Sequence, residues 1–191
     1  MDKEVSAMAQ TAKTRLNAAA YYQLPDYAQH DLIQLIDGEV VLSMPPIPRH
    51  QAIVGEILFL LMTIAKKNNG RAFTSPIEVY LDEHNIYEPD VLYLSSDTTC
   101  SIEEKRLVGA PDLVVEVLSP GTAKFDRQEK YQAYERHGVG EYWIVDPVHE
   151  VVEVWALTEG RFVRQGAYAG EDTFQSDQLA ETISVSSFFP T

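Results

Sequence analysis

Cysteine, long apolar runs and positive charge are all scarce in this chain of 191 residues. The single cysteine, Cys100, excludes an internal disulfide, which suits a reducing compartment. No apolar run approaches the roughly 18 residues that a membrane-spanning helix needs. The first residues also lack the basic start and apolar stretch of a signal peptide. The sequence therefore predicts a cytoplasmic protein that makes no use of a membrane.

Acidic residues outnumber basic ones by 29 to 15, so the formal net charge is −14. This balance argues against strong nonspecific binding to nucleic acid, because such binding depends on neutralising phosphates. The excess is concentrated in residues 78–120, which hold ten acidic and two basic side chains, whereas residues 45–77 hold one acidic and four basic. An acidic pocket in a less acidic surround suits a metal site, and a solvated acidic surface explains the same excess.

The hydrophobic share of 45% is enough for a sizeable core, and the length suits one domain over residues 1–191. Residues 1–30 are interpreted as a lead-in with a helix over 14–23. Asp37-Gly38 separates two β-rich runs and predicts a tight hairpin. The remaining periodicities predict, in order, a helix over 50–68, strands over 77–81, 91–94 and 113–118, a helix over 122–137, a strand over 141–147, and a hairpin of 151–157 with 162–168. This order predicts an α/β fold with a mixed central β-sheet flanked by helices and extra hairpins at both ends.

One of these strands carries an acidic side chain where an apolar one is expected. Glu116 lies among the valines of residues 113–118, and Asp90 opens the apolar run at 91–94. A buried carboxylate is costly unless a partner compensates its charge. If the two strands pair, Asp90 approaches Glu116, and two neighbouring carboxylates suit Mg²⁺ or Mn²⁺. The alternative is that both are ordinary strand residues.

Lys130 lies on the helix that follows the Glu116 strand, and its ammonium is the candidate to orient an attacking water. In that case the ammonium points at Asp90 and Glu116, and Lys130→Ala lowers the rate of any reaction at this site with thermal stability nearly unchanged. The alternative is a solvent-exposed pair with Asp126, four residues earlier on the helix.

Five further residues are weaker candidates for the same site. Glu56 and Glu78 are carboxylates that the first long helix and a neighbouring strand can supply. Asp112 shares a face with Glu116, although a cap at the strand entry explains it equally well. Ser119 can hold the lysine or a water, or serve as a turn hydroxyl before a proline. His50 opens a helix, where a solvent-facing side chain is the alternative.

The chain resembles the Uma2 family, also called DUF820, which is assigned to the PD-(D/E)XK nuclease superfamily with the restriction-endonuclease-like fold. The resemblance covers roughly residues 20–189. It rests on residues 111–120, Asp126, Lys130 and residues 138–147, with upstream matches at 32–40, 45–51 and 88–91.

The resemblance implies a metal-dependent phosphodiesterase site. Asp90 corresponds to the carboxylate of the Pro-Asp motif, and Glu116 to the second acidic position. The usual lysine position, two residues later, is Leu118 in this sequence. The resemblance implies that the lysine has moved to the next helix, as Lys130. The implied activity is that of an endonuclease that uses Mg²⁺ or Mn²⁺ on nucleic acid, with DNA ahead of RNA.

Two other functions compete with this interpretation. A non-catalytic interaction protein that keeps the nuclease fold is favoured by the charge of −14 and by Leu118. A glycosidase-like pair of carboxylates is disfavoured by the adjacent lysine. A homodimer is expected because cleavage of a duplex needs two sites, and the hairpins near Tyr142 and Trp155 offer apolar area for the interface.

Overall fold

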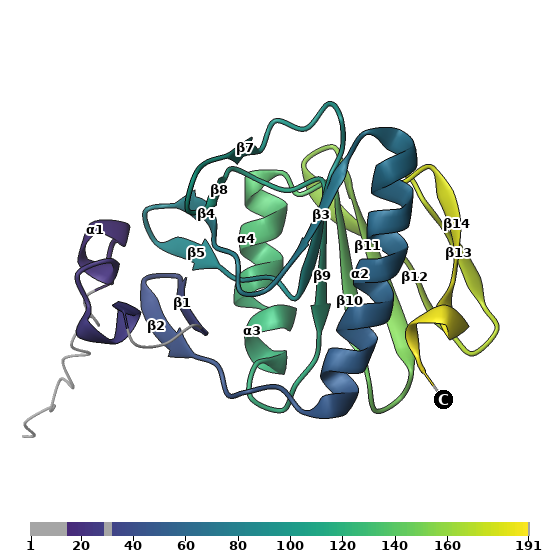
Figure 1. Ribbon diagram of the computed structural model, residues 1–191, viewed down its shortest axis with the longest axis horizontal. Helices are drawn as coiled ribbons and strands as arrows, with labels where there is room; N and C mark the ends of the chain where they lie inside the picture. The colour runs from purple at the N-terminus through teal and green to yellow at the C-terminus, as the bar shows by residue number, and fades with distance from the viewer. Residues whose placement is uncertain (1–14, 29–31, 191) are drawn as a thin grey trace, which may run out of the picture.

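Two six-stranded β-sheets organise the chain in the computed structural model, which describes residues 15–28 and 32–190 (Figure 1). The N-terminal sheet has the order β2-β1-β5-β4-β8-β7. Its strands are β1 (Ile33–Ile36), β2 (Glu39–Leu42), β4 (Val79–Asp82), β5 (Asn85–Tyr87), β7 (Ser101–Ile102) and β8 (Leu107–Val108).

The second sheet is central to the site and has the order β12-β11-β10-β9-β6-β3. Its strands are β3 (Arg71–Thr74), β6 (Val91–Leu94), β9 (Leu113–Val117), β10 (Glu141–Asp146), β11 (Val151–Thr158) and β12 (Arg161–Ala169). Strand β9 pairs parallel to β10 and antiparallel to β6, so this sheet is mixed. A separate hairpin follows, made of β13 (Thr173–Ser176) and β14 (Glu181–Ser184).

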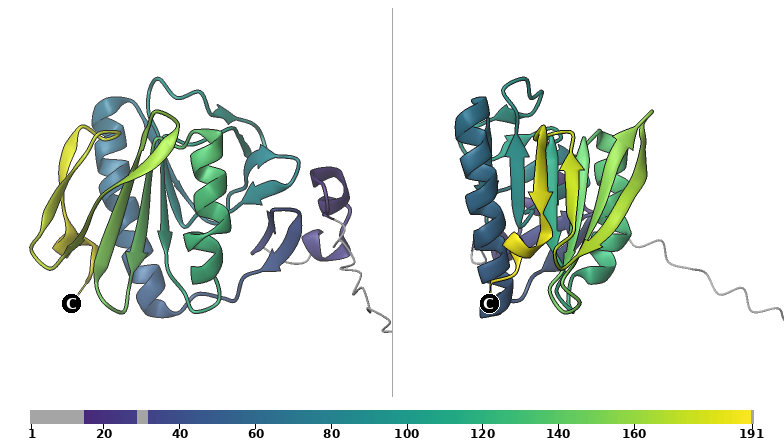
Figure 2. Two further views of the ribbon diagram at one scale, coloured as in Figure 1. Left: turned by 180° about the vertical axis from the view of Figure 1, so that it is seen from behind. Right: turned by 90° about the vertical axis from the view of Figure 1, so that its right-hand side faces the viewer.

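Helices cover both faces of the central sheet. Figure 2 shows α2 (Pro48–Asn68) on one side, and α3 (Ala123–Arg127) with α4 (Glu129–His137) on the other. The short elements are α1 (Ala18–Tyr21) and the 3₁₀ turns η1 (Pro25–Ala28) and η2 (Val185–Phe188). The predicted α/β architecture with a mixed sheet flanked by helices is confirmed.

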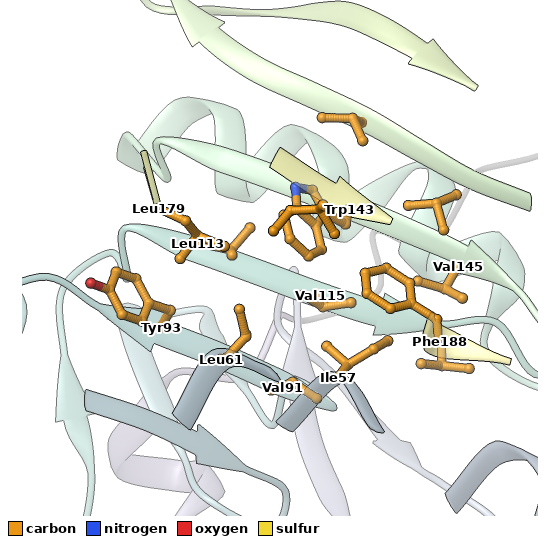
Figure 3. Packing of buried hydrophobic residues seen from close by; sticks show 14 of the residues in the cluster. Ile57, Leu61, Val91, Tyr93, Leu113, Val115, Trp143, Val145, Leu179 and Phe188 are labelled. Atoms are coloured by element: carbon orange, nitrogen blue, oxygen red, sulfur yellow. The ribbon is translucent and has the colours of Figure 1, made fainter. Parts of the chain in front are cut away.

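The long helix α2 follows directly from its sequence. Pro48 occupies its first turn, where a missing backbone N–H costs nothing. Its apolar residues recur with helical spacing, and Asn69 ends it in the left-handed conformation at φ 54°. The buried stripe includes Ile57 and Leu61, which pack on Val91, Val115 and Trp143 of the sheet (Figure 3). This packing fixes the start of α2 beside the end of β9.

Four expectations about the fold need correction. The helix expected over 122–137 is two helices, because Gln128 leaves helical geometry at φ −126° and ψ −78°. The helix expected over 14–23 is only α1, and residue 14 lies outside the described residues. The strand expected over 77–81 is β4, which begins only at Val79 and belongs to the N-terminal sheet, so Glu78 is not part of it.

The fourth correction concerns the expected dimer interface. Tyr142 is fully buried, and it packs against Tyr131, Tyr134 and Phe162 in the protein's own core. Trp155 is partly buried against Tyr131. Tyr142 therefore provides no apolar area for an interface, and Trp155 provides only part of its surface.

Within the described residues, none of the helices combines the length and the apolar character that crossing a membrane requires.

Candidate active site

Asp90 stands at the start of β6, opposite Glu116 on the neighbouring strand. The antiparallel ladder ends with the pair of Val91 and Val115, and Asp90 and Glu116 are the next residues along the two chains. The carbonyl of Asp90 accepts a hydrogen bond of 2.8 Å from the Thr74 hydroxyl on β3. Its carboxylate Oδ2 accepts one of 2.7 Å from the backbone N–H of Val117. Hydrogen bonds thus fix both the backbone carbonyl and the carboxylate of Asp90, and its side chain is 21% exposed.

Glu116 lies in the middle of β9 and is only 3% exposed. Its Oε1 accepts hydrogen bonds from two groups of α4, the ammonium of Lys130 at 2.8 Å and the hydroxyl of Tyr134 at 2.8 Å. Both donors reach Oε1, so Oε2 is the oxygen that remains for another partner. The ammonium of Lys130 therefore points at the strand carboxylate, although the usual lysine position is Leu118.

Asp126 completes a buried group of charges around Lys130. Its Oδ1 lies 3.2 Å from Lys130 Nζ, and the two side chains are 1% and 2% exposed. The sequence predicts this pair as an alternative, but on the solvent-exposed surface. Burial also overturns the expectation that Lys130→Ala leaves thermal stability nearly unchanged, because the substitution leaves two buried carboxylates without their cationic partner.

His50 lies in the first turn of α2 and is buried rather than facing solvent. Its Nε2 is 2.9 Å from the carbonyl oxygen of Val117 and 3.4 Å from Asp90 Oδ2. Both neighbours are acceptors, so Nε2 carries a proton and donates to them. His50 therefore joins the start of α2 to the two strands that carry the carboxylates.

Burial shifts the titration of these groups. It raises the pKa of Glu116 to about 8, against the opposing effect of the Lys130 ammonium. Burial also raises the pKa of Asp126, and the nearby charge of Asp90 adds to this. Burial alone would lower the pKa of Lys130, but the charges of Glu116 and Asp126 raise it, so the side chain is an ammonium. Burial likewise opposes the charged form of His50, but Asp90 raises its pKa.

The other four weaker candidates lie outside this cluster. Glu56 is exposed on α2, and Glu78 accepts a hydrogen bond from Tyr22 in a separate cavity of about 450 Å³. Asp112 accepts a hydrogen bond of 2.9 Å from the backbone N–H of Ser95, which makes it a cap. The Ser119 hydroxyl contacts the Thr122 hydroxyl at 2.9 Å, as a turn residue does.

Two further residues belong to this site, Asp126, which the sequence predicts only as an exposed partner of Lys130, and Tyr134. They precede and follow Lys130 by four residues, so the three side chains share one face across α3 and α4. That spacing was the available signal: a polar stripe on the helix that follows a strand bearing a buried Glu.

No cluster of three or more His, Cys, Asp or Glu side chains suited to a metal ion occurs in residues 15–28 and 32–190. The oxygen atoms available as metal ligands here belong to the carboxylates of Asp90 and Glu116 and to the backbone carbonyl of Val117. Mg²⁺ is commonly held by one or two carboxylates, with water and substrate phosphate as its other ligands. The donor set therefore fits Mg²⁺ or Mn²⁺ and does not fit a closed structural metal site.

Comparisons with known proteins agree with this architecture. An uncharacterized protein of Synechocystis sp. is 25% identical over 158 residues, which cover 78% of this chain and 89% of that protein. The crystal structure of a "putative nuclease belonging to DUF820" from Anabaena variabilis superposes with a TM-score of 0.74 at 18% identity. It covers 91% of this chain and 97% of the other, and it shows the shared fold.

The profile of the Uma2 family, described as "Putative restriction endonuclease", matches residues 18–186. The match spans both sheets and every residue of the buried cluster. The chain therefore belongs to the Uma2 family.

Proposed function

We propose that this protein is a divalent-metal-dependent endonuclease that hydrolyses phosphodiester bonds, with DNA as its substrate. One observation carries the proposal: two carboxylates on adjacent strands, Asp90 and Glu116, lie beside a buried lysine ammonium, 2.8 Å from Glu116. This combination suits phosphoryl transfer, where negative charge develops on the phosphate oxygens and on the leaving group.

Asp90 and Glu116 would hold Mg²⁺ or Mn²⁺, with the carbonyl of Val117 as a neighbouring oxygen donor. The ion supplies Lewis acidity, and it lowers the pKa of bound water. Lys130 is an ammonium, so it donates hydrogen bonds and cannot accept a proton. Its role is to orient the attacking water or to bind a phosphate oxygen as negative charge develops. Tyr134 fixes the rotamer of Glu116 through its hydroxyl.

The test is cleavage of plasmid DNA by the purified chain in Mg²⁺, in Mn²⁺ and in EDTA. We expect nicked or linear product with either metal ion and none in EDTA. Undigested plasmid under all three conditions would contradict the proposal.

A specific observation favours a second candidate, a non-catalytic protein that keeps the nuclease fold. Glu116 and Lys130 are 3% and 2% exposed, so neither meets substrate without local opening. Undigested plasmid together with binding of DNA or of a protein partner would support this candidate.

We also propose a homodimer, through the exposed apolar segment around β2. Leu42, Met44 and Ile47 are 54%, 83% and 65% exposed, and β2 is an edge strand. Light scattering at micromolar concentration should give twice the chain mass of 21.5 kDa. Met44→Asp should shift the mass toward the monomer, and Val148→Asp, at another exposed apolar residue, should leave it unchanged. A monomer mass for the parent would contradict this proposal.

A further inference from the structure

Asp126 is a buried acidic residue beside Lys130, yet the proposed mechanism gives it no role. Its Oδ1 is buried and accepts no hydrogen bond of suitable geometry, although Lys130 Nζ lies 3.2 Å away. Burying a carboxylate in this way is costly. Lys130 could pair with Glu116 alone, so the pairing of Lys130 does not require a second acid.

Two hydrogen bonds fix the backbone of Asp126. Its backbone carbonyl accepts a hydrogen bond of 2.9 Å from the Tyr142 hydroxyl, and its N–H donates to the Thr122 carbonyl at 3.0 Å. The side chain is therefore held against the ammonium by the end of α3 and by β10. A substitution that keeps the shape of this side chain leaves those anchors intact.

The charges of the cluster suggest what Asp126 does. A divalent cation on Glu116 is opposed by the Lys130 ammonium, which already sits on the same carboxylate at 2.8 Å. The carboxylate of Asp126 also contacts this ammonium, and its negative charge offsets the positive charge of Lys130. Metal ligation requires that Glu116 is ionised. With all three carboxylates ionised, the net charge of the cluster is −2, from Asp90, Glu116 and Asp126 together with the ammonium of Lys130. That charge matches one divalent cation.

We infer that Asp126 is a charge-compensating residue: it neutralises Lys130, so that the site formed by Asp90 and Glu116 keeps the net negative charge that attracts a divalent metal ion. This inference rests on the proposed metal-dependent function. Without Asp126, the cluster carries −1 and holds the ion less tightly. Asp126 is a positioning residue here, because it acts through Lys130 and not on the metal or the substrate.

The experiment is calorimetric titration of Mn²⁺ into the full chain at a single pH, so that the charge on His50 is common to all variants. Asp126→Asn should weaken Mn²⁺ binding by about 10- to 100-fold, the range found for groups that support metal ligands. Asp126→Glu keeps the charge and should bind nearly as the parent does. Glu56→Gln removes an exposed acid from α2 and serves as the control for net charge. Thermal melts of each variant confirm that it is folded.

The double variant Asp126→Asn with Lys130→Met separates compensation from direct ligation. It restores the cluster charge to −2, so it should bind Mn²⁺ more tightly than Asp126→Asn and close to the parent. A double variant as weak as Asp126→Asn would make Asp126 a direct ligand and overturn the inference. Asp126→Asn binding like the parent would overturn it as well. A parent chain without any Mn²⁺ site would instead contradict the proposed function itself.

Discussion

Replacing Glu116 by glutamine is expected to reduce metal-dependent DNA cleavage by roughly 1,000-fold, because it removes one of two anionic ligands and the partner of Lys130. Glutamine keeps the size of the side chain, and its amide oxygen still accepts hydrogen bonds from Lys130 and Tyr134. The loss therefore reports charge rather than misfolding. The measurement is the initial rate of plasmid nicking in Mn²⁺.

Glu56→Gln provides the matched control for this substitution. It removes the same charge from an exposed position on α2, and it should cleave at the parental rate. If Glu116→Gln cleaves as fast as Glu56→Gln, Glu116 has no part in the reaction.

Lys130→Ala is expected to lower the free energy of unfolding by about 3–5 kcal/mol, since breaking a buried ion pair leaves uncompensated charge behind. The ammonium is 2% exposed, and it is shared by Glu116 at 2.8 Å and Asp126 at 3.2 Å. Urea denaturation at a pH above the pKa of Glu116 in the folded chain, where its carboxylate is ionised, measures the effect.

Lys124→Ala is the control, because this lysine is exposed on the adjacent helix α3. A surface substitution of this kind should change the free energy of unfolding by less than about 0.5 kcal/mol. Equal stabilities for the two variants would mean that Lys130 is solvated and lies outside the cluster.

The same burial makes stability depend on pH in a definite direction. The pKa of Glu116 is raised from 4.5 to about 8 in the folded chain, chiefly by burial, so the folded state holds a proton that the unfolded state releases. Stability should therefore fall as the pH rises through this window. Melting temperatures between pH 5 and pH 8 test this, and Glu116→Gln should flatten the profile. Lys130→Ala should steepen it.

The parts of the fold that the sequence predicts are those set by local chemistry. Asp37-Gly38 provides a turn with φ values of 51° and 77°, and the β1–β2 hairpin forms there. The spacing of apolar residues predicts α2, and the run of 113–118, apolar except for Glu116, predicts a buried strand, β9. In each case the signal lies within a few turns of helix or one strand.

The pairing of strands and the contacts between distant residues could not be predicted from such local patterns. Strands β7 and β8 have two residues each, too few to show a period, and yet they complete the N-terminal sheet. The break at Gln128 lacks a Gly or Pro to mark it. The burial of His50 depends on contact with Val117, 67 residues later, which no local pattern reveals.

For the site, a carboxylate in an apolar strand was an adequate signal for Glu116, and the start of the next apolar run marked Asp90. Asp126 was recognised as a partner of Lys130 but was assigned to the surface, because the i, i+4 spacing is the same in both settings. Only the packing of α3 and α4 on the sheet distinguishes a buried pair from an exposed one.

The most direct test of the central claim is the anomalous diffraction of crystals soaked in Mn²⁺. The account predicts a peak within about 2.6 Å of carboxylate oxygens from both Asp90 and Glu116. An anomalous peak confined to other residues, or carboxylates more than about 8 Å apart with no peak between them, would contradict it, because metal–oxygen bonds cannot span that distance.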